Sequence, residues 1–211
     1  AAFSMVQTAD GGYALAGCTN SFGAGYVDFW LVKVGWIHDV AITDVAPSKT
    51  VVGQGYSLNI NVTVKNYGAF TETFNVTAYT NMTSIATQTI TLTSGNSTTI
   101  LLTWNTTGFA KGNYTISAYA EPVPGETAPE DNTLTGGWVL VTILGDVNGD
   151  RTVNILDCIM IANHFGHKNG DGHTPGTKEW WGCMNCDING DSQVNILDCI
   201  ILAGHFGQKW Q

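Results

Sequence analysis

The sequence predicts a mainly β protein, in which an immunoglobulin-like antiparallel β-sandwich follows an N-terminal β-meander and precedes a small α-helical domain with two acidic loops. Three observations carry this prediction. Residues 37–143 alternate apolar and polar side chains with the period of two that half-buried strands require. Residues 1–36 contain shorter alternating runs, and residues 144–211 contain an acidic loop twice, each time followed by a helical pattern. We therefore expect three consecutive domains with these boundaries.

Residues 1–36 predict three short strands, within residues 4–8, 12–17 and 28–34, with a Gly-rich loop before the third. Residues 7–13 read Gln-Thr-Ala-Asp-Gly-Gly-Tyr. This stretch resembles one blade's worth of the propeller-type repeats of large surface proteins, particularly archaeal ones. Propellers need about 4–8 blades, and one partial copy is present here.

An isolated meander of this size buries little surface and leaves its sheet edges unpaired. Three interpretations are open. Residues 1–36 are the tail of a longer propeller protein, or their strands pack on the sandwich of the same chain, or they add to a sheet of a neighbouring copy. Strand addition of the last kind would build a polymer.

The sandwich should contain about seven short strands, separated by turns such as residues 66–68, 94–96 and 111–113. The alternating runs cover residues 56–64, 74–79, 90–92, 100–104, 114–119 and 138–143. Apolar positions on one face of these runs predict the core, which should hold Val62, Val64, Val76, Leu102, Trp104, Ile116 and Val139.

Several short sequence motifs follow one another along residues 37–143 in an order that resembles the CARDB adhesion-type domain. They are His38-Asp-Val-Ala-Ile42, Val64-Lys-Asn-Tyr-Gly68, Leu102-Thr-Trp104, Gly112-Asn-Tyr114, and Pro124-Gly-Glu126 ahead of Asp131-Asn132. The resemblance implies a non-catalytic spacer or adhesion module of a cell-surface protein.

The same segment contains all the Asn-x-Ser/Thr sequons of the chain, which begin at Asn61, Asn75, Asn81, Asn96, Asn105 and Asn113. A Thr-rich sandwich produces some sequons by chance, but this density is higher than chance predicts. We therefore predict a glycosylated surface and a secreted protein.

Two acidic loops predict a paired calcium site. Calcium takes about 6–8 oxygen ligands, which a 12-residue loop supplies from positions 1, 3, 5, 7 (through its carbonyl), 9 and 12. In the first loop these positions hold Asp146, Asn148, Asp150, Thr152 (carbonyl), Asn154 and Asp157. In the second they hold Asp187, Asn189, Asp191, Gln193 (carbonyl), Asn195 and Asp198. Because every side-chain position carries an oxygen, we predict two bound Ca²⁺ ions.

The loops depart from the EF-hand pattern. Position 6, usually glycine, holds Arg151 and Ser192, and position 12 holds Asp instead of Glu. The residues before each loop do not predict a helix, so a helix–loop–helix sensor is not expected. A helical pattern follows each loop and ends at a glycine; it consists of Ile155, Leu156, Ile159, Ala162 and Phe165 before Gly166, and of Ile196, Leu197, Ile200, Ala203 and Phe206 before Gly207.

A calcium loop followed by one helix, present twice, resembles the dockerin domain over residues 145–208. The resemblance implies that loop positions 10 and 11 face a cohesin partner. Those positions hold Ile155 and Leu156 in the first copy and Ile196 and Leu197 in the second. The alternative is that these apolar side chains belong to the core of the domain.

Four of the five cysteines, Cys158, Cys183, Cys186 and Cys199, lie in the calcium-loop domain. For an exported protein we expect two disulfides there, linking Cys183 and Cys186 to Cys158 and Cys199, with Cys18 free or paired between chains. The alternative is a zinc site, because Cys183 and Cys186 stand near His164, His167 and His173 in the sequence.

Composition restricts the partners. The chain has 211 residues, a formal net charge of −9, and Arg151 as its one arginine, so nucleic acid and anionic membranes are poor partners. Its apolar runs are shorter than the roughly 20 residues of a membrane span, so we expect no membrane insertion.

We predict no catalytic site, because paired Glu carboxylates, a Gly-x-Ser-x-Gly stretch and a phosphate-binding loop are all missing from the sequence. His164 and His205 stand at equivalent helix ends, where packing or capping explains them. Trp180 and Trp181 could stack on a carbohydrate ring or pack over a small core.

Two hypotheses of function follow. The first is an exported, calcium-stabilised structural protein of a microbial, and by its resemblances archaeal, cell surface, which self-assembles into a fibre or adhesion stalk. The second, implied by the dockerin resemblance, is the anchoring end of an extracellular polysaccharide-degrading enzyme that docks to a cohesin-like domain.

Overall fold

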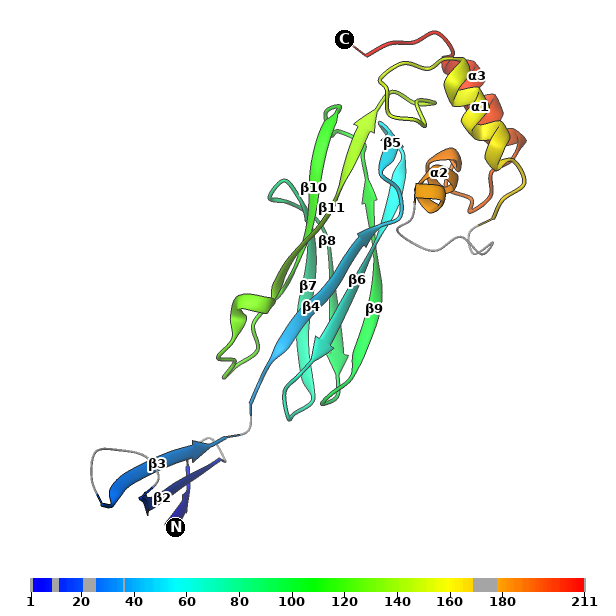
Figure 1. Ribbon diagram of the computed structural model, residues 1–211. Coiled ribbons are helices and arrows are strands. Elements are labelled where there is room, and N and C mark those ends of the chain that lie inside the picture. The colour runs from blue at the N-terminus through cyan, green and yellow to red at the C-terminus, as the bar shows by residue number, and fades with distance from the viewer. Residues whose placement is uncertain (1, 9–11, 21–25, 36, 169–177, 211) are drawn as a thin grey trace.

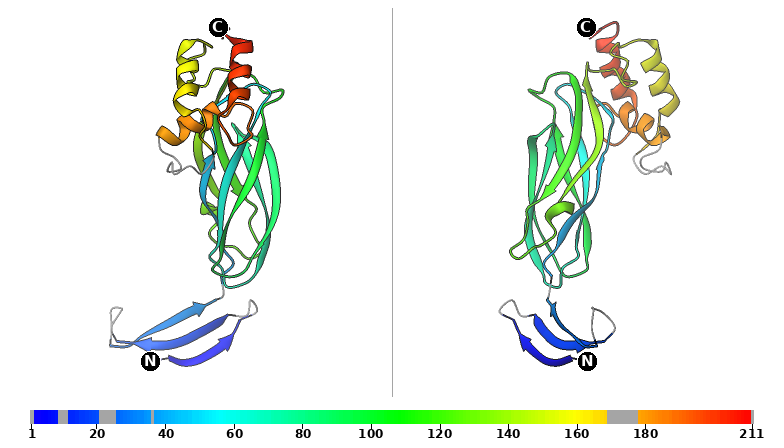
Figure 2. Two further views of the ribbon diagram at one scale, coloured as in Figure 1. Left: turned by 90° about the vertical axis from the view of Figure 1, so that its right-hand side faces the viewer. Right: turned by 60° about the vertical axis from the view of Figure 1, so that its left-hand side comes forward.

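The computed structural model describes residues 2–8, 12–20, 26–35, 37–168 and 178–210. It is mainly β, as predicted, and consists of a small N-terminal sheet, a central β-sandwich and a C-terminal helical module (Figure 1). The N-terminal sheet lies at one end of the sandwich, and the helical module lies at the other end (Figures 1 and 2).

The N-terminal sheet consists of the three expected strands, β1 (Ala2–Gln7), β2 (Tyr13–Thr19) and β3 (Asp28–Val34), paired antiparallel in the order β1-β2-β3. Its apolar side chains are exposed on both faces: the neighbours Met5 and Val6, which point to opposite faces, are 63% and 62% exposed. The sheet therefore does not bury a face on the sandwich of its own chain, which removes one of the three interpretations of residues 1–36.

The central sandwich has a three-stranded and a five-stranded sheet. The first has the order β4-β6-β9, with β4 (Val40–Pro47), β6 (Ser57–Asn66) and β9 (Ser97–Asn105). The second has the order β5-β11-β10-β7-β8, with β5 (Val51–Gly53), β7 (Glu72–Thr80), β8 (Thr83–Leu92), β10 (Gly112–Ala120) and β11 (Thr133–Thr142). A 3₁₀ turn, Pro129–Asp131, precedes β11. The sandwich is antiparallel except for the pairing of β5 with β11, which is parallel.

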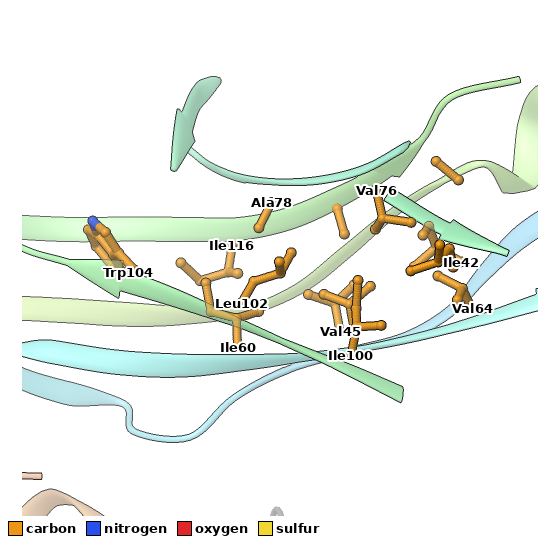
Figure 3. Packing of buried hydrophobic residues seen from close by; sticks show 14 of the residues in the cluster. Ile42, Val45, Ile60, Val64, Val76, Ala78, Ile100, Leu102, Trp104 and Ile116 are labelled. Atoms are coloured by element: carbon orange, nitrogen blue, oxygen red, sulfur yellow. The ribbon is translucent and has the colours of Figure 1, made fainter. Parts of the chain in front are cut away.

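The predicted core is confirmed: Val62, Val64, Val76, Leu102, Trp104, Ile116 and Val139 are all buried in one cluster. Figure 3 labels Val64, Val76, Leu102, Trp104 and Ile116 within it. Strand β6 shows why, since burial alternates residue by residue along its whole length. Trp104 anchors one end of the core through edge-on contacts with Phe109 and Tyr114, whose ring centroids lie 5.2 and 5.3 Å away.

Two polar residues of the CARDB-like motifs hold loops to the sandwich by hydrogen bonds. Buried Asn66 donates from Nδ2 to the carbonyls of Phe70 (2.7 Å) and Leu92 (2.9 Å). The Glu126 carboxylate accepts from the backbone N–H groups of Val40 (3.1 Å) and Val123 (2.8 Å). These side chains form hydrogen bonds with backbone groups that have no partner in the strand pairings.

The helical module contains α1 (Ile155–His164), α2 (Lys178–Cys186) and α3 (Ile196–His205). Helices α1 and α3 were predicted, but α2 was not, and it ends at the residue before Asp187. The expectation that no helix precedes either loop is therefore wrong for the second loop. The segment Lys178–Cys186 is much less apolar than the other two helices and contains Gly182. Its helix packs against α1, a tertiary contact that local pattern does not reveal.

Three polar side chains join the module to the sandwich. The Asn185 Oδ1 accepts from the backbone N–H groups of Thr50 (3.0 Å) and Val51 (3.1 Å), and its Nδ2 donates to Thr50 Oγ1 (3.0 Å). Buried Lys49 donates from Nζ to the main-chain carbonyl of Asp187. Thr142, at the end of β11, donates from Oγ1 to Asp146 Oδ2 (2.6 Å). The module is thus attached to β5 and β11, next to both acidic loops.

Replacing Asn185 with Ala should lower the free energy of unfolding of the module by about 1–3 kcal/mol, because two N–H groups at the interface lose their acceptor. Calorimetry in calcium measures this as a downward shift of the module's transition. Gln88→Ala, on the exposed face of β8, is the control and should change stability by less than about 0.5 kcal/mol. Equal shifts in both variants would contradict the role of Asn185.

Candidate calcium sites and an exposed helix face

Position 1 of the first loop is a nearly buried carboxylate that organises the turn around it. Asp146 Oδ1 accepts from the backbone N–H groups of Gly149 (2.8 Å) and Asp150 (3.1 Å). Its Oδ2 accepts from the N–H of Arg151 (2.9 Å). The chain therefore wraps around Asp146 and brings the following polar positions to the same side.

Position 12 closes the loop and starts the next helix. Asp157 is fully buried, and its Oδ1 accepts from the N–H groups of Val147 (2.9 Å) and Asn148 (3.2 Å). Its Oδ2 accepts from the N–H of Asn154 (2.8 Å), while Asn154 Oδ1 accepts from the N–H of Leu156 (2.7 Å). This reciprocal pair is a capping box, in which Asn154 is the N-cap of α1.

The intermediate positions converge on one spot at the mouth of the loop. Asn148 Nδ2 lies 3.1 Å from Asp150 Oδ2, and Asn154 Nδ2 lies 3.4 Å from the same oxygen. Asn154 Nδ2 is also 3.4 Å from the Thr152 carbonyl, the predicted position 7 ligand. The Asn148 Oδ1 accepts from the backbone N–H of Asp150 (2.8 Å).

The second loop repeats this geometry. Asp198 is fully buried and accepts from the N–H groups of Ile188 (2.7 Å), Asn189 (3.2 Å) and Asn195 (2.8 Å). Asp187 accepts from the N–H groups of positions 4, 5 and 6, as Asp146 does. Asn189 Nδ2 and Asn195 Nδ2 lie 3.0 and 3.1 Å from Asp191 Oδ2, and the N–H of Gln193 donates to Asp191 Oδ1 (2.9 Å).

Charge in the loops favours a bound cation. Burial raises the pKa of Asp146, Asp157 and Asp187, and the neighbouring carboxylates of Asp157 and Asp150 raise those of Asp146 and Asp157 further. The donor set is made of oxygen atoms, which suits a hard cation such as calcium. The residues present therefore fit the predicted ion, which would neutralise carboxylates that the fold has withdrawn from water.

Lys49 distinguishes the second loop from the first. Its buried ammonium favours the ionised form of Asp187 and so lowers the pKa of that carboxyl group, against the raising effect of burial. Sequence reasoning missed Lys49 and Thr142, because both come from the sandwich and reach the loops only through tertiary structure.

Position 6 explains why EF-hand loops favour glycine there. Arg151 and Ser192 have φ angles of 70° and 71°, in the left-handed region. This conformation brings the Cβ atom of a non-glycine residue close to the backbone and costs about 1–2 kcal/mol. Both loops therefore accept local strain to keep their ligand geometry.

Ser192→Gly should raise the free energy of unfolding by roughly 0.5–1 kcal/mol, since the relief of strain exceeds the extra entropy of glycine in the unfolded chain. Ser192→Ala keeps the Cβ atom and is the matched control, for which we expect no gain. Melting in calcium compares the two, and identical melting temperatures would contradict the account of position 6.

The apolar residues at loop positions 10 and 11 are exposed. Ile155, Leu156, Ile196 and Leu197 are 60%, 54%, 60% and 50% exposed, so the alternative that they form the core is wrong. The helices instead bury their opposite sides, with Ile161 of α1 and Leu202 of α3 in the core of the module. Two short helices thus present apolar side chains to solvent.

Between α1 and α3 lies an open apolar groove of about 610 Å³. Equivalent residues of the two repeats line it in pairs: Cys158 and Cys199, Ile161 and Leu202, Ala162 and Ala203, and Phe165 and Phe206. The groove and the four exposed residues at loop positions 10 and 11 are together called the helix face here, and each of its residues in one repeat has an equivalent in the other.

The cysteines do not form the expected disulfides. All five lie in the part of the chain that the structure describes, and no disulfide joins any two of them. Cys158 and Cys199 line the groove on separate helices, whereas Cys183 and Cys186 are buried on or at the end of α2. His173 and the side chains of Trp180 and Trp181 lie outside the described residues.

The predicted sequons are accessible in varying degree. Asn81, Asn96, Asn105 and Asn113 are exposed, and Asn61 and Asn75 are half-buried. Asn81 lies at the turn between β7 and β8, where it and Met82 have positive φ angles of 45° and 78°. Among helices in the described ranges, none has both the length and the apolar character needed to cross a membrane.

Family models match two segments of the chain. The CARDB model matches residues 38–134, and the dockerin type I domain model matches residues 144–207. The protein therefore contains a CARDB domain followed by a dockerin type I domain, and both resemblances seen in the sequence are confirmed. Both domain types are non-catalytic, dockerins are calcium-binding domains with a protein partner, and the pair fits an adhesion or assembly role at or outside the cell surface.

Similar solved structures cover about half of the chain. The CARDB domain of a Pyrococcus furiosus protein, solved with di-metal ions, is 24% identical; the match covers 50% of this chain and 89% of that domain, with a TM-score of 0.42. A domain of a Methanosarcina acetivorans protein proposed to lie at the cell surface is 28% identical, covers 50% and 92%, and has a TM-score of 0.41. A β-glucosidase from Erythrobacter marinus is 13% identical and covers 49% of this chain but 15% of that enzyme, with a TM-score of 0.40. No curated protein matches the chain.

Proposed function

We propose that this protein is a non-catalytic, exported assembly protein of a cell surface, stabilised by two calcium ions and joined to other molecules at its two ends. The observation that carries the proposal is the pair of exposed apolar surfaces, one on the N-terminal sheet and one on the helix face, separated by the length of the sandwich (Figures 1 and 2). A long sandwich with a contact surface at each end suits a spacer or stalk.

Calcium in this proposal is structural. Asp146, Asn148, Asp150, the Thr152 carbonyl and Asp157 would hold one ion, and the equivalent residues Asp187, Asn189, Asp191, the Gln193 carbonyl and Asp198 the other. Asn154 and Asn195 are helix caps through their Oδ1 atoms and would reach the ion through water, as position 9 often does. When bound, calcium supplies the positive charge that the buried carboxylates otherwise lack.

Removal of calcium with a chelator should lower the melting temperature of residues 144–211 and leave the sandwich transition near its original position. At a free calcium concentration about a hundredfold above Kd, each site should contribute about 3 kcal/mol to the stability of the module. Magnesium at the same concentration is the control and should restore little of this, because it demands a smaller octahedral site. The same calorimetric transition with chelator and with calcium would contradict the proposal.

Self-assembly through the N-terminal sheet is the first form of contact that we propose. Large apolar side chains are exposed on β1 and β3, including Phe3, Phe29 and Leu31. Within the described residues no further strand pairs with the outer edge of β1 or β3. Unpaired edges are templates for strands of another chain, and a repeated heterologous contact of this kind extends into a fibre.

Docking of a cohesin-like protein to the helix face is the second form of contact. It is favoured by the exposure of Leu156 and Leu197 and by the apolar groove between α1 and α3. It corresponds to an anchoring role, in which the protein or an enzyme joined to it is held by another surface protein. The two forms use different ends of the molecule, so each can be tested without disturbing the other.

Two double variants separate these contacts. Phe29→Lys with Leu31→Lys should abolish self-association, because charged side chains disfavour both apolar contact and edge pairing. Leu156→Lys with Leu197→Lys should weaken cohesin binding by at least about thirtyfold, the loss expected when central contact residues are removed. Each variant is the control for the other, with sedimentation velocity and calorimetric titration as the measurements, both in calcium.

A wild-type protein that stays a monodisperse monomer at high concentration in calcium would contradict self-assembly. Unchanged cohesin affinity in the helix-face variant would contradict docking at that surface. Leu101→Lys, on the exposed side of β9, tests for nonspecific effects of added charge and should alter neither result.

Glycosylation of the sandwich is a further part of the proposal. The exposed Asn81, Asn96, Asn105 and Asn113 are the sites where glycans should be found most fully, with lower occupancy at half-buried Asn61 and Asn75. Mass spectrometry of peptides from native material measures this occupancy. A native protein with the mass of the bare polypeptide would contradict it.

A further inference from the structure

Two histidines and one cysteine of the helical module come together outside the set of predicted calcium ligands. His164 is the last residue of α1, His167 follows it in the turn, and Cys183 lies on α2. One ligand atom from each residue, an imidazole nitrogen or the thiol sulfur, lies within 4.8 Å of the other two. The histidines are half-buried, and Cys183 is buried with 4% exposure.

The donor chemistry of this cluster differs from that of the calcium loops. Imidazole and thiolate are ligands for zinc and related transition metals, whereas calcium takes oxygen. Zinc lies about 2.0–2.1 Å from nitrogen and about 2.3 Å from sulfur, so neighbouring donors in a tetrahedral site are roughly 3.3–3.7 Å apart. Small side-chain rotations would bring three donors that already lie within 4.8 Å to these separations.

The backbone positions of all three residues are held by the fold. The N–H of His167 donates to the carbonyl of His164 (3.1 Å), and the carbonyl of His167 accepts from the N–H of Val194 (2.9 Å) in the second loop. Gly182 allows α2 to approach α1, because a Cβ atom there would lie 2.9 Å from His164 Nε2. That nitrogen is therefore directed at the turn of α2 that carries Cys183.

The internal repeat shows that the backbone of the turn after the helix does not need the imidazole of His167. At the places that correspond to His164 and His167, the second repeat has His205 and Gln208. Gln208 makes the same backbone contact, since its carbonyl accepts from the N–H of Val153 (2.9 Å). The backbone of this turn therefore does not require the imidazole of His167, which leaves that side chain available for another role.

We propose that His164, His167 and Cys183 form a binding site for a single transition-metal ion of the zinc class. Three protein donors would leave the fourth position of a tetrahedral ion for water or another small ligand. The ion would join α1, the turn after it and α2, and so hold α2, which carries Asn185, against α1. This site shares no side-chain ligand with the calcium loops and is separate from the contacts proposed above.

The test uses the full chain, reduced with a phosphine and saturated with calcium, and titrates it with Co²⁺ as a spectroscopic probe. We expect one Co²⁺ per chain, with visible bands of a tetrahedral ion and a near-ultraviolet thiolate-to-cobalt band, and displacement by Zn²⁺. Cys183→Ser should remove the thiolate band. His167→Gln, which copies Gln208 of the second repeat, should weaken cobalt and zinc binding at least about tenfold.

His205→Gln is the matched control, because it removes the equivalent histidine of the second repeat, and it should bind cobalt as the wild type does. Circular dichroism and calcium titration of each variant show whether the module stays folded. Absence of a tetrahedral cobalt spectrum in the wild type would overturn the proposal. So would a spectrum that persists in both His167→Gln and Cys183→Ser, or one that is lost equally in His205→Gln.

Discussion

Asp157 and Asp198 place two fully buried carboxylates at the centre of the helical module, each held by three backbone N–H groups. Each carboxylate closes its loop and accepts from the backbone N–H of the residue that caps the following helix. Burying a carboxylate is costly unless hydrogen bonds and a positive charge compensate for the lost water. The loop geometry, the start of each helix and the demand for a cation therefore share one physical origin.

The module and the sandwich form an interface of polar contacts at the second loop. Asn185 satisfies two backbone N–H groups at the start of β5, and Lys49 reaches back to the carbonyl of Asp187. Since Asn185 and Asp187 are close neighbours in the chain, the order of the second loop and the attachment of α2 to the sandwich are linked. A change in the conformation of the second loop would therefore alter how the module is attached to the sandwich.

The arrangement of the three parts gives the molecule two contact surfaces of different kinds. The N-terminal sheet offers backbone edges and apolar side chains on both faces, and the helix face offers a compact groove between two equivalent helices. Strand pairing is tolerant of sequence, because the backbone carries it, whereas a groove selects its partner by shape. The sandwich between them, with accessible sequons, separates the surfaces and buries its own apolar residues.

Local pattern was sufficient for helices α1 and α3, the N-terminal strands and the sandwich core, because helical periodicity and strand alternation are visible in consecutive residues. It was not sufficient for α2, for the short strand β5, or for the role of Asn185, whose partner Thr50 is 135 residues away. Whether Ile155 and Leu156 face the core or solvent, and whether His164, His167 and Cys183 meet, was likewise decided by packing. Side-chain periodicity identifies an apolar face, but only the neighbouring elements determine whether that face is covered.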